Sequence, residues 1–145
     1  RPHHSNFGKR LIKSPKLYFL DTGLLCWLLR VGSPADLAGH AARGAIFETF
    51  VLSELTKAFL NRGERPEVYF WRDSAGHEVD FLLDLGARLA PIEAKSGQTA
   101  ASDFFDGLKR WRNLAKKESG NPVLVYGGDT AAVREGIALT PWWAV

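Results

Sequence analysis

The sequence predicts an α/β domain with a mixed central sheet flanked by helices. From residue 44 to residue 127, the spacing of apolar residues indicates in order a helix, three strands, a helix and a strand. The last of these strands, "PVLVYGG", is a continuous apolar run, which is typical of a strand buried on both faces. The chain has 145 residues, of which 46% are hydrophobic and 24% charged, and this is enough for one core.

The first 43 residues are predicted to precede this domain. Residues 1–15 are polar, basic and punctuated by proline, which predicts a linker or the remnant of an upstream domain. Because the chain contains no methionine, we expect it to be a piece of a larger polypeptide. Residues 16–43 are predicted to form an extension that packs on the core. It would consist of a strand over 16–20, an apolar helix with Asp21 as N-cap that ends at Gly32, and a connector with a helical turn.

Residues 44–145 are predicted to form the domain itself. Apolar residues recur at helical spacing over residues 44–60, and "NRGERP" ends that helix. The remaining expected elements are strands over 67–72, 78–84 and 88–95, a helix over 102–118, a strand over 122–128 and one or two edge strands in the tail.

Four acidic residues and a lysine are concentrated in the predicted hairpin "HEVDFLLDLGARLAPIEAK". Since residues two apart in a strand share a face, Glu93 and Lys95 are expected to point the same way. A two-residue turn at 85–86 places Glu78 across from Glu93, whereas a four-residue loop at 85–88 places Asp80 there. Either register brings Asp80 within roughly 8 Å of Glu93. On the first strand, one face is expected to carry Val79, Phe81 and Leu83, and the other Glu78, Asp80, Leu82 and Asp84.

This concentration of carboxylates predicts a cation site. Like charges that face each other across a ladder are unfavourable unless a cation lies between them. Lys95 supplies part of that charge, and hard oxygen ligands suit a divalent ion such as Mg²⁺ or Mn²⁺. Lys95 could then hold or deprotonate a water for attack on a phosphodiester. Glu48 faces the apolar side of its predicted helix and needs a partner there. The alternative is a solvated sheet face with a cross-strand ion pair.

The same residues resemble a known family. The order of elements, with Glu48 on the first helix, Asp80 on the second strand and "EAK" on the third, resembles the PD-(D/E)XK nuclease superfamily, although Val79 stands where the proline of that name would be. The stretches "KSPKLYFLDTGLL", "GAIFETFVLSEL", "YFWRDSAGHEVDFLL" and "PIEAKSG" look like the nuclease-like domain of unknown function that follows the ATPase module of predicted prokaryotic AAA-type ATPases.

The resemblance implies a restriction-endonuclease-like fold and a set of roles. Asp80 and Glu93 would ligate Mg²⁺ or Mn²⁺ together with the Ala94 carbonyl, Glu48 would complete or support the metal shell, and Lys95 would position the nucleophilic water. The expected function is that of a nuclease-like domain of an ATPase, which binds nucleic acid, with DNA expected, and hydrolyses its phosphodiesters. The first alternative is an inactive DNA- or protein-binding module that regulates the ATPase. The second is a structural domain whose acidic residues are relics.

Composition adds the expected partners and compartment. With a net charge of +3, the chain is mildly basic, and its candidates for contact with nucleic acid are Arg72, His77, Gln98, Lys109, Arg110 and Arg112. The sequence has no Gly-rich phosphate loop, so ATP hydrolysis is not expected of it. One cysteine, Cys26, excludes an internal disulfide, and neither a membrane span nor a signal peptide is recognisable. We therefore expect a soluble protein of the reducing cytoplasm.

Overall fold

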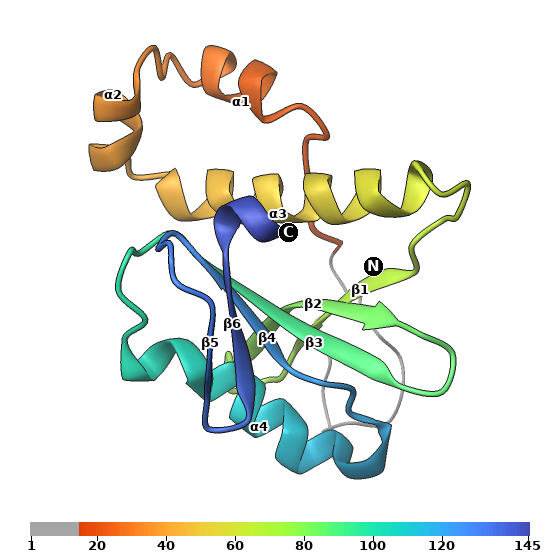
Figure 1. The fold of residues 1–145 in the computed structure, drawn as a ribbon. Helices are drawn as coiled ribbons and strands as arrows, with labels where there is room; N and C mark the ends of the chain where they lie inside the picture. Colours follow the sequence, from red (N-terminus) through yellow and green to blue (C-terminus); the bar gives the residue numbers. More distant parts are fainter. Residues whose placement is uncertain (1–14) are drawn as a thin grey trace.

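A six-stranded mixed sheet forms the centre of the computed structural model, which describes residues 15–145 (Figure 1). Its strand order is β1-β2-β3-β4-β6-β5. Strands β1, β2 and β3 pair antiparallel, β3, β4 and β6 pair parallel, and β5 runs antiparallel to β6. The prediction of an α/β domain with a mixed sheet is confirmed. The strands are β1 (Val68–Arg72), β2 (Glu78–Asp84), β3 (Leu89–Lys95), β4 (Val123–Tyr126), β5 (Ala132–Arg134) and β6 (Ile137–Pro141).

Helices cover both faces of this sheet. On one face α3 (Arg43–Leu60) packs through Val51 on Phe81, Ile92 and their apolar neighbours. On the other face α4 (Asp106–Ala115) packs through Leu108 and Trp111. Short 3-10 turns over Ser102–Phe105, Lys116–Glu118 and Trp142–Ala144 complete the described helices. No helix among residues 15–145 has the length and apolar character that crossing a membrane requires.

In the N-terminal extension, the helical part lies over α3 on the side away from the sheet, whereas residues 15–20 pass α3 and reach β2 (Figure 1). It contains α1 (Thr22–Leu28) and α2 (Pro34–Gly39). The expected N-cap is confirmed, because Asp21 Oδ1 accepts the Leu24 N–H at 2.9 Å. The helix ends before Gly32, because Arg30 adopts a left-handed backbone conformation with φ of 59°.

Two strand predictions are wrong. Residues 16–20 belong to no strand, because their contacts with the core are made by side chains and by one backbone carbonyl. In the tail, β5 is an exposed edge strand as expected, but β6 lies inside the sheet between β4 and β5. Ile137 and Leu139 are buried there, as an interior strand requires. Of the predicted linker, residues 1–14 lie outside the described part of the chain.

Candidate functional site

The hairpin of β2 and β3 has the register that places Asp80 next to Glu93. Its pairs run from Asp84 with Leu89 to Phe81 with Ile92, so the loop has four residues, 85–88. Extending this register by one residue sets Asp80 opposite Glu93. Of the two turns considered from the sequence, the four-residue loop is therefore the one that forms. One residue further along β3, the Ala94 N–H donates a hydrogen bond to Asp80 Oδ2 at 3.0 Å. The hairpin therefore holds the Asp80 carboxylate against the backbone of β3.

A β-bulge in β2 decides which way Asp80 faces. Tyr69 pairs with Leu82 and Trp71 pairs with Val79, so Phe70 alone lies opposite two residues of β2, Asp80 and Phe81. The extra residue breaks the alternation: Val79 and Leu82 lie in the core under α4, whereas Phe81 and Leu83 lie in the core under α3. The prediction that Val79, Phe81 and Leu83 share one face is wrong for this reason, and so is the grouping of Asp80 with Leu82.

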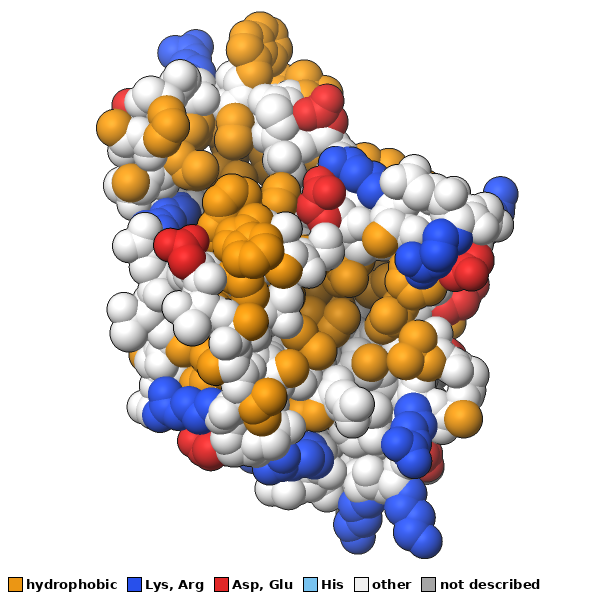
Figure 2. Space-filling view, viewed as in Figure 1, with side chains coloured by type: hydrophobic (Ala, Val, Ile, Leu, Met, Phe, Trp, Pro, Cys, Tyr) orange, Lys and Arg blue, Asp and Glu red, His pale blue; other side chains and the backbone are white. Residues whose placement is uncertain are grey.

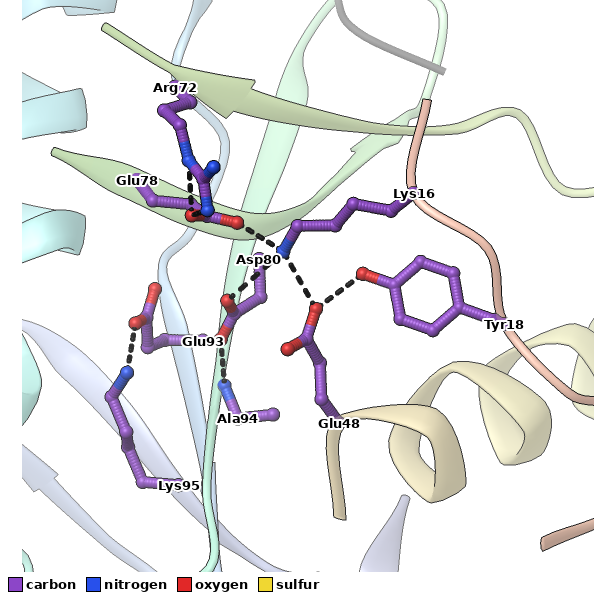
Figure 3. Close-up of polar contacts among 9 residues, drawn as sticks. All are labelled: Lys16, Tyr18, Glu48, Arg72, Glu78, Asp80, Glu93, Ala94 and Lys95. Carbon is purple, nitrogen blue, oxygen red and sulfur yellow. Dashed lines mark hydrogen bonds and ion pairs between the residues drawn. The ribbon is translucent and has the colours of Figure 1, made fainter. Parts of the chain in front are cut away.

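Four carboxylates and three cations meet at this point, as Figure 3 shows. We call the four carboxylates the acidic cluster: Glu48 of α3, Glu78 and Asp80 of β2, and Glu93 of β3. Lys95 Nζ lies 2.5 Å from Glu93 Oε1, so these two residues share a face as predicted. Arg72 pairs with Glu78 across β1 and β2. The structure thus brings together Glu48, Asp80, Glu93 and Lys95, the residues singled out by the sequence.

The third cation comes from the N-terminal extension. Lys16 Nζ lies 2.9 Å from Glu48 Oε1 and 4.0 Å from Asp80 Oδ1, and it pairs with Glu78. The Tyr18 hydroxyl donates to the same oxygen of Glu48. Glu48 is therefore directed inward, as expected, but its partners are Lys16 and Tyr18. Sequence reasoning missed both, since no spacing pattern links them to a residue about thirty positions away.

Burial and mutual repulsion make two of the carboxylates reluctant to ionise. Burial, and then the charge of Glu48, raise the pKa of Asp80 to about 6. Burial, and then the charge of Asp80, raise the pKa of Glu93 to about 7. These two groups therefore favour an additional positive charge.

The lysines carry much of the available positive charge. Burial lowers the pKa of Lys16, but hydrogen bonds to Glu78 and Glu48 outweigh it, so the pKa is raised. Burial also acts against the charged form of Lys95, and the carboxylates, Glu93 foremost, raise its pKa overall. Both lysines are therefore cationic at neutral pH.

Glu93 has a carboxylate oxygen that can still accept a ligand. It is 6% exposed, and its Oε2 is buried without a hydrogen-bond partner among the described residues. A methyl group built on Gly107 of α4 would lie 3.4 Å from this oxygen and 2.5 Å from the Glu78 carbonyl oxygen, so the start of α4 packs directly against the site. Asp80 also lines a cavity of about 70 Å³ with Lys16, Tyr18 and Phe81 among its walls. The space is large enough for water.

No three acidic, histidine or cysteine side chains within residues 15–145 are arranged as a ready-made metal site. Lys16 lies instead in front of three carboxylates. The donor set nevertheless fits a hard cation chemically, since it offers carboxylate oxygens. Two of them, Glu78 Oε1 and Glu93 Oε2, are buried without a hydrogen bond among the described residues, and of these Glu78 Oε1 pairs with Lys16.

The candidate nucleic-acid residues separate into two groups and one outlier. Arg110 and His77 both contact Asp73, next to Arg72 and hence near the acidic cluster. Lys109 pairs with Glu135 at 2.6 Å, and Arg112 donates to the Glu135 carbonyl at 3.1 Å, in the turn between β5 and β6. Gln98 is exposed. Figure 2 shows basic side chains over the end of the molecule that α4 forms.

Comparison with known proteins identifies relatives without an assigned activity. Residues 43–145 match the family model "Domain of unknown function (DUF4143)", and residues 1–35 match "Domain of unknown function (DUF8612)". The uncharacterized proteins Rv2008c of Mycobacterium tuberculosis and Mb2031c of Mycobacterium bovis are each 36% identical over 98 residues, which cover 68% of this chain and 21% of the relative. The chain thus spans about a fifth of the length of these relatives. No solved structure matches it significantly.

Proposed function

This chain belongs to the DUF4143 family of domains of unknown function, and we propose that it is a nuclease-like domain that hydrolyses DNA phosphodiesters with Mg²⁺. One observation supports this most. Glu48, Asp80, Glu93 and Lys95 come from α3, β2 and β3 and lie together in one cluster, in which Asp80 and Glu93 are buried and Glu48 and Lys95 are half-buried. A surface ion pair would leave its carboxylates solvated, whereas the pKa values of Asp80 and Glu93 are raised by burial.

The residues that would hold Mg²⁺ or Mn²⁺ are Asp80, Glu93, Glu48 and the Ala94 carbonyl. The unsatisfied Oε2 of Glu93 supports this choice, and so does the raised pKa of Asp80, because a bound dication would stabilise both carboxylates. When bound, the ion supplies a Lewis acid that polarises a phosphoryl oxygen.

The remaining chemistry falls to the chain's own side chains. Lys95 carries a proton at neutral pH, since its pKa is raised, so its Nζ can donate hydrogen bonds. It therefore suits holding the attacking water or stabilising developing charge better than removing a proton. The Ala94 N–H fixes the Asp80 carboxylate by its bond to Oδ2. Arg72, Arg110 and His77 flank the cluster and would contact phosphates of the strand being cut.

The second candidate is a catalytically inactive module that binds DNA or protein and regulates an ATPase in the same polypeptide. Two observations favour it. Lys16 already neutralises much of the cluster. In addition, α1 and the C-terminal turn expose large apolar side chains, among them Trp27 at 74% and Trp143 at 61%. Figure 2 shows apolar groups gathered on that side of the molecule. Such patches are typical of protein interaction surfaces.

Cleavage assays separate the two candidates. Branched, single-stranded and duplex DNA would be incubated with the chain in Mg²⁺ or Mn²⁺ and in chelator. The proposal expects metal-dependent cutting that falls by roughly 10² or more in Lys95→Ala and Asp80→Asn. The control is Lys57→Ala on α3, because Lys57 makes an exposed ion pair with Glu54 away from the cluster. Absence of cutting by the parent, or equal cutting by the variants, would exclude catalysis and leave the binding module.

A further inference from the structure

We propose that Lys16 is a tethered cation that competes with a divalent metal for the acidic cluster, so that metal binding releases the N-terminal strap. The strap is defined as residues 15–20. This inference rests on the metal requirement of the proposed function and concerns the regulation of the same site. Lys16 also lies outside residues 43–145, the part of the chain that the DUF4143 model matches.

Lys16 and a metal would need the same oxygen atoms. Asp80 Oδ2 is occupied by the Ala94 N–H, and the other oxygen, Oδ1, is the one that faces Lys16 at 4.0 Å. Glu48 Oε1 accepts hydrogen bonds from both Lys16 Nζ and the Tyr18 hydroxyl. An ammonium group and a dication at these oxygens would also repel each other at short range. Both therefore cannot bind there at full strength.

Charge counting favours exchange over joint occupancy. The four carboxylates, when ionised, carry four negative charges, and Lys16, Lys95 and Arg72 carry three positive charges. A dication that replaces Lys16 makes the cluster neutral, whereas a dication that joins Lys16 leaves one excess positive charge. The buried Glu93 Oε2, which has no partner among the described residues, offers the entering ion a ligand that Lys16 does not use.

The strap is attached in a way that permits release. It contacts the core through Lys16, through Tyr18, whose ring lies 5.9 Å from that of Phe81, and through the Leu20 carbonyl, which accepts from Ser53 Oγ at 2.6 Å. No sheet ladder holds it, since residues 15–20 belong to no strand. Leu17 and Leu20 are 89% and 64% exposed, so lifting the strap uncovers little apolar surface from these two.

Calorimetric titration with Mn²⁺ tests the competition. Lys16→Met removes the charge and keeps much of the stem, and it should bind Mn²⁺ about tenfold or more tightly than the parent. Lys16→Arg keeps the charge and should bind about as weakly as the parent. The control is the same substitution at Lys57, which lies on the same helix as Glu48 but pairs with Glu54. Lys57→Met should bind Mn²⁺ with the affinity of the parent.

A second measurement uses the unmodified chain and so does not depend on how a variant folds. The rate at which an amine-reactive reagent labels Lys16, followed by mass spectrometry, should rise when Mn²⁺ is added, while labelling of Lys57 stays constant. Unchanged labelling of Lys16, or no gain in Mn²⁺ affinity for Lys16→Met, overturns the inference.

These outcomes are distinct from failure of the proposed function. If neither the parent nor Lys16→Met binds Mn²⁺, both the metal-dependent function and the inference fail. If Mn²⁺ binds the parent and Lys16→Met equally, the inference fails while the function stands. If Lys16→Met gains affinity but no protein cuts DNA, competition stands and hydrolysis fails.

Discussion

Replacing Asp80 by asparagine is expected to stabilise the folded domain at neutral and alkaline pH in the absence of metal. Asparagine keeps an oxygen that can accept the Ala94 N–H, which now bonds to Asp80 Oδ2 at 3.0 Å. It removes a buried charge whose ionisation is opposed by burial and by Glu48. The gain in the free energy of unfolding should therefore follow the ionisation of Asp80 in the parent.

The magnitude follows from the pKa. Folding raises the pKa of Asp80 from 3.8 to about 6. Since one pKa unit corresponds to about 1.4 kcal/mol, ionising this group costs the folded state up to about 3 kcal/mol. This pKa already includes the attraction of the Asp80 carboxylate to Lys95 and Lys16, so about 3 kcal/mol is the upper limit of the gain expected at pH 8.

The direction of the pH dependence follows from which state, folded or unfolded, holds the Asp80 proton more tightly. The folded state holds the Asp80 proton more tightly than the unfolded state does, so the protonated carboxyl favours folding below about pH 4. That contribution is lost as the pH rises through the folded pKa of about 6. The advantage of Asp80→Asn over the parent should therefore be small near pH 4, grow between pH 4 and 6, and level off above pH 7.

Denaturant unfolding of the parent and of Asp80→Asn from pH 4 to pH 8 measures this difference. The control is Asp129→Asn, because Asp129 is exposed and makes none of the contacts of the cluster. Adding Mg²⁺ at pH 8 should stabilise the parent more than Asp80→Asn. A variant that is less stable than the parent at pH 8, or a difference that does not vary with pH, would refute the reasoning.

Three further predictions concern neighbouring residues. Gly107→Ala should destabilise the domain by about 1 to 3 kcal/mol in chemical unfolding, because its methyl group would lie 2.5 Å from the Glu78 carbonyl oxygen. In the control Gly39→Ala the methyl group meets no atom within 4 Å, so the free energy of unfolding should not fall in this way. Tyr18→Phe should lower the unfolding free energy by about 1 to 3 kcal/mol by removing a hydrogen bond to the Glu48 carboxylate, while Tyr69→Phe, whose partner Glu67 is exposed, should cost less. Arg110→Ala should weaken DNA binding in titrations at several salt concentrations and reduce the slope against log salt by about one; an unchanged slope argues against a phosphate contact.

The sequence predicted the layers of the fold and three of the four carboxylates of the acidic cluster, Glu48, Asp80 and Glu93, because these follow from patterns of burial along one element. Periodicity identified α3 and the hairpin, and the inward face of α3 predicted that Glu48 needs a partner. The orientation of Asp80 could not be predicted, since the bulge opposite Phe70 arises from how two strands pair and leaves no mark in the alternation of β2. Lys16 and Tyr18 were missed for a similar reason, because their roles depend on where the chain places the strap.

The acidic cluster lowers the stability of the folded domain at neutral pH, and this argues against a purely structural role. A cross-strand ion pair on a solvated sheet would leave the pKa of its carboxylates near or below the ordinary range. Here burial and neighbouring charges raise the pKa values of Asp80 and Glu93 to about 6 and about 7, so both groups weaken the fold when ionised at neutral pH. Asparagine and glutamine would offer hydrogen bonds at these positions without that cost. Charges that oppose folding and lie together are typical of functional sites, where a ligand restores the lost stability. If Mg²⁺ or Mn²⁺ failed to stabilise the parent chain more than Asp80→Asn, this explanation of the cluster would be lost.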